Sequence, residues 1–208
     1  MIEVYAWRTS NGLRATIALA ESGLPHRVIP VDVSKGEQKT PDYLSVNPAG
    51  QIPALVDPQG PNGQRLVLAQ SGAIVMYACH KAQRFIPQDP QRYATASQWA
   101  FQAASDIAGT SAAMNQLENV SPEKVQSHID LFRKRFARYF GIVEAQLKTR
   151  DYLADELSFA DLMLYPNYAL KRDLLTAADY PALNAWGARM AARPGVQQGM
   201  RLLTDAGV

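Results

Sequence analysis

The stretch from Val46 to Asp57, Val-Asn-Pro-Ala-Gly-Gln-Ile-Pro-Ala-Leu-Val-Asp, constrains the fold of this chain more than any other. Proline cannot donate a hydrogen bond to a strand ladder, so Pro53 at the entrance of an apolar strand predicts a strand edge, a bulge or a cis peptide bond. A cis Ile52–Pro53 bond would turn the backbone N–H and C=O of Ile52 outward. A bound peptide could then pair with them.

A second motif, Gln70-Ser71-Gly72, opens a predicted helix soon afterwards. The first N–H groups of a helix have no partner within it, and the Ser71 hydroxyl adds a further donor, so this helix start suits a carboxylate. Together the two motifs predict a site for a small peptide on an α/β domain.

The first part of the chain alternates short strand patterns with helix patterns. Strands are predicted over residues 2–7 and 27–32, and a hairpin over 53–56 and 65–68. Helices are predicted from about Asn11 to a stop at Gly23, after Thr40-Pro41, and over residues 71–82. This order predicts a small mixed sheet with helices on its faces.

The rest of the chain has helical periodicity over residues 91–118, 121–148, 158–173 and 181–192. Ser158 and Asp161 have the spacing of a capping box, which is a folding element and not a catalytic pair. Because Pro87 and Pro90 interrupt the pattern, we expect an α/β domain over residues 1–82, a linker over 83–90 and an all-α domain over 91–208.

Composition excludes several classes of function. The formal net charge is only +2, so neither nucleic acid nor a membrane surface is an expected partner. No stretch reaches the ~20 apolar residues of a membrane span. A single cysteine, Cys79, fits a reducing cytoplasm, and its apolar neighbours predict a packed thiol. The three histidines lack ligand spacing, so no metal site is expected.

The motif Asn-Pro-x-Gly-x-Ile-Pro-Ala-Leu over residues 47–55, followed by Gln-Ser-Gly-Ala-Ile over 70–74, resembles the cytosolic glutathione transferase family. Thr9-Ser10-Asn11-Gly12 is similar to the Thr-Pro-Asn-Gly pattern of the bacterial Nu class, whose members resemble disulfide-bond reductases more than conjugating enzymes. The resemblance implies a thioredoxin-like N-terminal domain that binds glutathione, a helical C-terminal domain that encloses the second substrate, and a homodimer.

The chemistry implied by the resemblance is ionisation of the glutathione thiol, whose ordinary pKa is about 8.5. Lowering that pKa by one unit requires ~1.4 kcal/mol of preferential stabilisation of the thiolate. By family position the donors to sulfur are Thr9 and Asn11, with Ser10 in the place of the class's proline. The ordinary alternative for Asn11 is a helix N-cap.

The resemblance also assigns the rest of glutathione to named residues. The cysteinyl unit would pair with the main chain of Ile52 beside Pro53, and the γ-glutamyl end would meet Gln70 and Ser71. Gln38 and Gln51 would reach the glycyl end.

Three positions depart from the Nu pattern. Gln51 stands where lysine is common, Gln70 where glutamate is usual, and Leu131 where an arginine is expected, with Arg133 or Arg135 as substitutes. Because charge-assisted hydrogen bonds are roughly twice as strong as neutral ones, these changes predict weaker glutathione binding.

The expected function is therefore activation of glutathione to reduce small disulfides or to conjugate hydrophobic electrophiles. Two alternatives stay open. The first is a glutathione-dependent isomerase of the Zeta class, whose Ser-Ser-Cys-x-Trp-Arg aligns with residues 9–14. The second is a non-enzymatic binding protein with a degraded glutathione site.

Overall fold

The structure, a computed structural model, describes residues 1–205 and divides into two compact units. One unit consists of residues 1–86 and the segment that starts at Ala191, and the other of residues 87–190. The domain limits given above, 1–82 and 91–208 with a linker between, remain a prediction.

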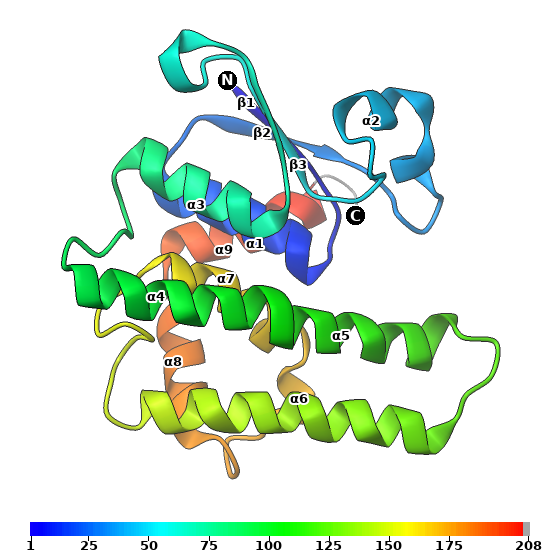
Figure 1. Cartoon of the computed structure of the whole chain (residues 1–208), viewed down its shortest axis with the longest axis vertical. Coiled ribbons are helices and arrows are strands. Elements are labelled where there is room, and N and C mark those ends of the chain that lie inside the picture. Colours follow the sequence, from blue (N-terminus) through cyan, green and yellow to red (C-terminus); the bar gives the residue numbers. More distant parts are fainter. Residues whose placement is uncertain (206–208) are drawn as a thin grey trace. The chain divides into compact units, whose positions relative to one another are not determined.

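The first unit is built on a four-stranded sheet in the order β2-β1-β3-β4 (Figure 1). Its strands are β1 (Ile2–Ala6), β2 (His26–Pro30), β3 (Ala54–Asp57) and β4 (Leu66–Ala69). β1 is parallel to β2 and antiparallel to β3, and β4 returns antiparallel to β3. The mixed sheet and the hairpin are thus confirmed.

Local sequence signals set the helices of this unit. α1 (Ser10–Ser22) begins after Thr9 and ends at Gly23, whose φ of 69° is left-handed. The Thr40 hydroxyl accepts from the N–H of Tyr43 and caps α2 (Pro41–Val46). The remaining elements are α3 (Ser71–Ala82), α9 (Pro194–Asp205) and the 3-10 turns η1 (Glu37–Lys39) and η2 (Pro61–Gly63).

Helix α9 was not predicted from the sequence pattern, and it packs against α1. The Thr16 hydroxyl donates to the carbonyl of Gly199 at 2.9 Å. A Cβ at Gly199 would lie 2.4 Å from Cα of Ile17, so only glycine permits this approach. The carboxylate of Glu21 accepts from Arg193 and from the N–H of Val196. α1 is therefore buried along most of its length.

The second unit is helical. It contains α4 (Pro90–Gln102), η3 (Ala103–Ile107), α5 (Ala108–Asn115), η4 (Gln116–Val120), α6 (Gln126–Leu147), α7 (Phe159–Leu170), η5 (Arg172–Leu174) and α8 (Pro181–Ala191). The helix expected over residues 91–118 is confirmed as one unbroken helical stretch, and it contains the two π-helical turns η3 and η4. Apolar periodicity does not register the widened i→i+5 turn.

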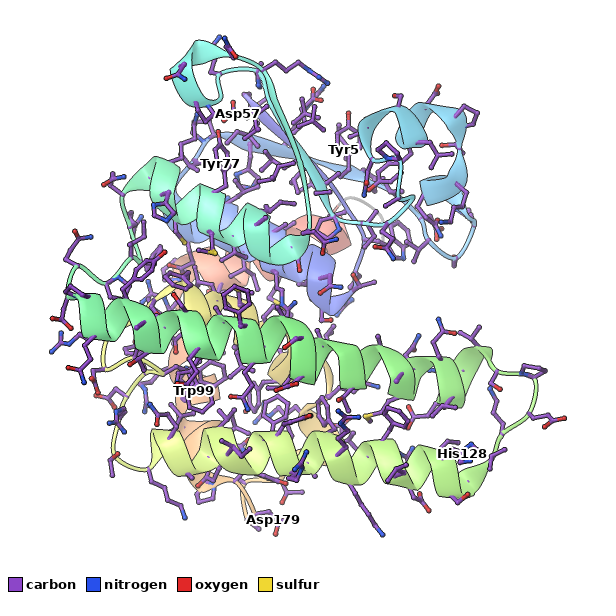
Figure 2. The ribbon with its side chains drawn as sticks, viewed as in Figure 1. Tyr5, Asp57, Tyr77, Trp99, His128 and Asp179 are labelled. Carbon is purple, nitrogen blue, oxygen red and sulfur yellow. The ribbon has the colours of Figure 1, made fainter. Side chains whose placement is uncertain are left out.

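The capping box at the start of α7 is confirmed. The Asp161 carboxylate accepts from the N–H of Ser158 at 3.0 Å and from the N–H of Leu153 at 3.1 Å. It also accepts from the indole of Trp186 at 2.9 Å. Trp186 is fully buried and Trp99 is 5% exposed, so both belong to the core as expected. Trp99, which comes from α4, is labelled in Figure 2.

Within residues 1–205, no helix combines the length and the apolar character that crossing a membrane requires.

Candidate functional site

The strand register brings three segments to one end of the sheet. Tyr5 pairs with Ala54, and Ala54 pairs with Ala69. Because β1 and β4 end where β3 begins, the loop after β1, the Ile52–Pro53 step before β3 and the start of α3 after β4 share one edge. These are the segments that carry most of the predicted site residues.

The start of α1 depends on a close backbone approach. A Cβ at Gly12 would lie 2.1 Å from the carbonyl oxygen of Trp7, so no larger residue fits there. Thr9 Oγ1 accepts from the N–H of Gly12 at 3.1 Å and caps the helix. Since this oxygen is an acceptor in the cap, the hydroxyl proton can still be donated to a ligand. Ser10, half-buried, is the first residue of α1.

Asn11 is therefore not the N-cap, and that alternative is wrong. Its side chain instead meets the start of α3, because the hydroxyl of Ser71 donates to Asn11 Oδ1 at 3.3 Å. Two predicted site residues, one for the sulfur and one for the γ-glutamyl end, are thus in direct contact. Asn11 is half-buried and Ser71 is buried.

Sequence reasoning missed Arg14, which completes this contact. Its guanidinium Nη1 lies 3.0 Å from Asn11 Oδ1 and 3.3 Å from Ser71 Oγ. Arg14 is only 1% exposed, and burial lowers its pKa to about 10, so it stays a cation at neutral pH. The available signal was a charged residue between Leu13 and Ile17 on the apolar face of α1.

On the β3 side, the Ile52–Pro53 bond is cis. The carbonyl of Gln51 is held by the hydroxyl of Tyr43 and the side-chain amide of Asn47, each at 2.6 Å. Pro53 is buried and Ile52 is half-buried. Within residues 1–205, no hydrogen bond reaches the N–H or C=O of Ile52. Both groups are therefore open to a peptide backbone.

Gln70 precedes α3 in an unusual conformation. Its φ of 72° and ψ of 117° lie in a region that favours glycine. Such a residue stores about 1–3 kcal/mol of strain and persists only where its surroundings hold it, commonly at functional sites. Its side chain is exposed beside the buried Ser71.

The turn at Gly50 brings in a second residue that the sequence did not indicate. A Cβ at Gly50 would lie 2.7 Å from the ammonium nitrogen of Lys39 and 3.0 Å from the carbonyl of Gln38. Lys39 thus places a positive charge beside Gln51, where the motif lacks a lysine. Gln38 Oε1 is buried and has no hydrogen-bond partner among the residues that the structure describes.

The substitutes proposed for the missing arginine have partners within the helical unit. Arg133 forms an ion pair with Glu118 at 2.8 Å. Arg135 Nε donates to the hydroxyl of Tyr139 at 3.3 Å. Leu131 is 62% exposed.

In the part of the chain that the structure describes, neither the thiol of Cys79 nor a cluster of metal ligands forms a second reactive centre. Cys79 is buried, and burial raises the pKa of its thiol to about 12, so it is a packed neutral thiol as expected. Among residues 1–205, no group of three histidine, cysteine, aspartate or glutamate side chains could hold a metal ion.

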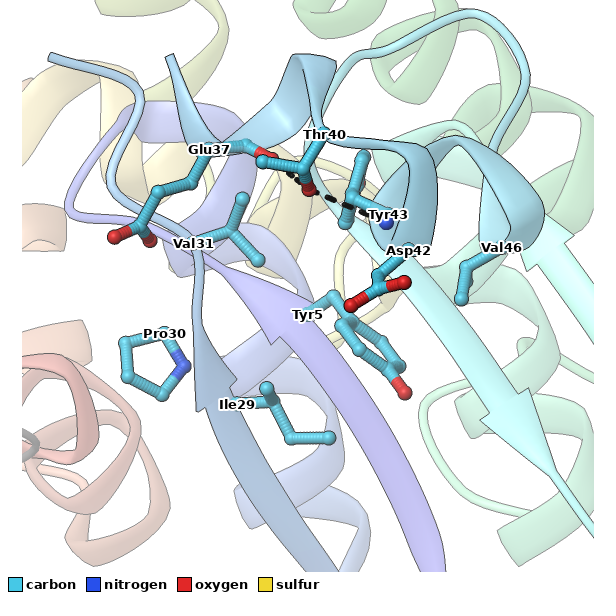
Figure 3. Close-up of a pocket in the computed structure, with 9 residues that line it drawn as sticks. All are labelled: Tyr5, Ile29, Pro30, Val31, Glu37, Thr40, Asp42, Tyr43 and Val46. Carbon is cyan, nitrogen blue, oxygen red and sulfur yellow. Dashed lines mark hydrogen bonds between the residues drawn. The ribbon is translucent and has the colours of Figure 1, made fainter. Parts of the chain in front are cut away.

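A pocket of about 360 Å³ lies between α2 and strands β1 and β2 (Figure 3). It is lined by Tyr5, Ile29, Pro30, Val31, Glu37, Thr40, Asp42, Tyr43 and Val46. None of the predicted site residues lines it. The rings of Tyr5 and Tyr43, which both line the pocket, meet edge to face at 6.0 Å, so these two residues belong to the packing between α2 and the sheet.

Comparison with known proteins identifies the family. Residues 1–79 match the glutathione S-transferase N-terminal domain, and residues 93–194 match the glutathione S-transferase C-terminal domain. The glutathione S-transferase-like protein tpcF of Aspergillus fumigatus is 36% identical over 220 residues, covering 96% of this chain and 94% of that protein. The chain belongs to the glutathione S-transferase family.

Two further relatives of this glutathione S-transferase bear on its chemistry. The disulfide-bond oxidoreductase YfcG of Escherichia coli is 30% identical, over 96% of this chain and 94% of YfcG. A glutathione transferase from Pseudomonas putida, crystallised with one glutathione disulfide per subunit, has a TM-score of 0.89 at 27% identity. That match covers 96% of this chain and 90% of the other. The predicted family and the predicted fold are confirmed.

Proposed function

We propose that this glutathione S-transferase binds glutathione at the shared edge of the sheet, activates its thiolate and uses it to reduce small disulfides. The single observation that carries this proposal is the contact between Asn11 and Ser71. It joins the residue aimed at the sulfur to the residue aimed at the γ-glutamyl carboxylate. The names of the Escherichia coli and Pseudomonas putida relatives support the same chemistry.

Each part of glutathione has a matching group. The γ-glutamyl carboxylate meets the hydroxyl of Ser71 and the N–H groups at the start of α3, with Gln70 beside them. The cysteinyl unit pairs with the free N–H and C=O of Ile52, next to Pro53. The glycyl carboxylate lies at Gln38, Gln51 and the ammonium of Lys39.

Thiolate activation comes from donors and from the helix. The hydroxyl of Thr9 and the amide NH₂ of Asn11 donate to sulfur, with Ser10 at the same turn. The N-terminus of α1 adds a favourable dipole for negative charge. All three contributions favour the thiolate over the thiol, so together they lower the thiol pKa.

The reaction is thiol–disulfide exchange. The glutathione thiolate attacks one sulfur of the substrate disulfide, a new S–S bond forms to glutathione, and the other sulfur leaves as a thiolate. A second glutathione repeats the attack on the mixed disulfide, so the electrons come from two glutathione thiols. Cys79 takes no part, because its thiol is buried and neutral.

We further propose a homodimer in the cytoplasm, with a small hydrophobic or disulfide co-substrate and without a metal.

The test combines binding with turnover. Calorimetric titration should show tighter binding of oxidised than of reduced glutathione, and the enzyme should turn over a mixed disulfide of glutathione with a small thiol. Asn11→Ala should lower kcat/KM at least ~10-fold, which corresponds to about 1.4 kcal/mol. Thr9→Ala should do the same, and Thr9→Ser should restore activity together with the cap.

The matched control is Asn119→Ala on the second unit, which should leave turnover unchanged. Thermal denaturation of each variant separates loss of chemistry from loss of fold. Unchanged turnover in both Asn11→Ala and Thr9→Ala contradicts the role of these residues. Absent binding of both forms of glutathione contradicts the proposed function itself.

A second candidate is a Zeta-type isomerase. The Euphorbia esula protein named glutathione S-transferase zeta class is 32% identical over 88% of this chain and 82% of that protein. The Zeta pattern has an arginine at position 14, as this chain does, but a cysteine at position 11, where this chain has Asn11. Glutathione-dependent isomerisation of maleylacetone would favour this candidate.

A further inference from the structure

We infer that Arg14 is a positioning residue, which orients the side-chain amide of Asn11 so that its NH₂ group faces the glutathione sulfur. This inference rests on the proposed function. It assigns a role to a buried cation that makes no proposed contact with glutathione.

The chemistry of the two side chains fixes the orientation. A guanidinium has only donors, so the Asn11 atom 3.0 Å from Nη1 has to be the acceptor, Oδ1. The NH₂ group of Asn11 is then on the other side of the amide, away from Arg14. A flipped amide would present an oxygen lone pair to the thiolate and raise the thiol pKa.

Ser71 holds the same oxygen only while the site is empty. A hydroxyl has one proton, which in the free protein is donated to Asn11 Oδ1 at 3.3 Å. When the γ-glutamyl carboxylate binds, Ser71 donates that proton to the ligand instead. Arg14 then remains the donor that fixes Asn11, while its own N–H continues to point at Ser71 Oγ at 3.3 Å.

Burial makes Arg14 suited to this role. At 1% exposure its planar guanidinium cannot swing into solvent, and it stays charged because its pKa is about 10. Nη1 of the planar guanidinium carries two N–H groups, so this one nitrogen can donate to Asn11 and to Ser71 together. A lysine ammonium is a compact point charge on a flexible stem and does not reproduce that geometry.

The experiment measures the thiol pKa of bound glutathione from thiolate ultraviolet absorbance as a function of pH. Arg14→Lys and Arg14→Gln should each raise this thiol pKa by about one unit. At a pH well below the pKa, such a shift lowers the thiolate fraction tenfold. In these variants the Kd for S-methylglutathione, which has no ionisable thiol, should change less than the Kd for glutathione. The exposed Arg27→Lys serves as the control and should leave the thiol pKa unchanged.

A double-mutant cycle separates positioning from a direct effect of the charge. In an Asn11→Ala background, Arg14→Lys should raise the thiol pKa no further. A full additional rise there overturns the inference, because Arg14 would then act on the sulfur without Asn11. Absence of any rise in the single Arg14 variants overturns it as well.

A further variant leaves Arg14 in place, in case its substitutions prevent folding. Asn11→Asp retains the acceptor for Arg14 but puts a carboxylate oxygen in the place of the NH₂ group, and its negative charge disfavours the thiolate, so the thiol pKa should rise above that of Asn11→Ala. A thiol pKa equal to that of the unmodified protein overturns the inference.

Failure of the proposed function would look different, because the unmodified protein would then not bind glutathione at all. The orientation is tested in that case by the side-chain amide ¹⁵N and ¹H resonances of Asn11 in the free protein. They should shift in Arg14→Lys, and unchanged resonances contradict the inference.

Discussion

The side chains of Ser71 and Asn11 are separated by 60 positions in the sequence and are hydrogen-bonded, with Ser71 Oγ 3.3 Å from Asn11 Oδ1. The contact joins the N-terminal ends of α1 and α3. It arises because β1 and β4 both end at the edge where β3 begins. A ligand that engages Ser71 therefore changes the hydrogen bonding of Asn11.

Replacing Ser71 should weaken glutathione binding more than it lowers turnover at saturation. Ser71→Ala removes the hydroxyl donor to the γ-glutamyl carboxylate, and hydrogen bonds to charged groups contribute ~1.5–3 kcal/mol. Calorimetry should show Kd rising at least ~10-fold. Ser71→Thr should retain most of the affinity, and Ser45→Ala on the exposed face of α2 is the control. An unchanged Kd for Ser71→Ala would assign the carboxylate to another group.

Lys39 should contribute to recognition of the glycyl carboxylate, because its ammonium lies against Gly50 beside Gln51. Lys39→Ala should raise the Kd for glutathione by about 5-fold, roughly 1 kcal/mol. The glycyl ethyl ester of glutathione, which lacks that carboxylate, should bind both proteins equally. Lys35→Ala, which removes a cation paired with Asp32 at 3.2 Å, is the matched control. Equal losses for glutathione and its ester would exclude a contact with the carboxylate.

Gly12→Ala should destabilise the protein although alanine is the better helix former. Its Cβ would lie 2.1 Å from the carbonyl oxygen of Trp7, so the turn before α1 has to move. Overpacking of this kind costs ~1–3 kcal/mol of unfolding free energy. The comparison is Gly141→Ala on α6, where a Cβ would meet no atom within 4 Å. The higher helix propensity of alanine should therefore stabilise the protein at that position. Denaturant unfolding of both variants measures the difference, and a stable Gly12→Ala would contradict the close approach.

Asp161 should make stability depend on pH in the acid range. Burial raises the pKa of this carboxyl from 3.8 to about 6. The folded state therefore holds the proton more tightly than the unfolded state, and this contribution is full below pH ~3.8 and lost as pH rises through ~6. Relative to Asp161→Asn, the unfolding free energy should fall by up to about 3 kcal/mol across that window. Parallel pH profiles of unfolding for the two proteins would contradict the raised pKa.

Many local elements of both units could be predicted from the sequence. Thr40 followed by proline, Gly23 after an apolar helix pattern, and Ser158 spaced from Asp161 are short-range signals with a direct backbone cause. The strands and α3 follow from apolar periodicity interrupted by turn residues. The family motif then predicted one site for Thr9, Asn11, Ile52 and Ser71.

The tertiary structure alone decided how those residues are linked. No site role was predicted for Arg14 or Lys39 from the sequence, because their contacts depend on what folding brings beside them: Asn11 and Ser71 for Arg14, and Gly50 for Lys39. Apolar periodicity also did not indicate the packing of α9 on α1 or the π-helical turns after α4. Periodicity reports which face of an element is apolar, whereas contacts between distant segments depend on strand register and on space left by residues such as Gly12 and Gly199.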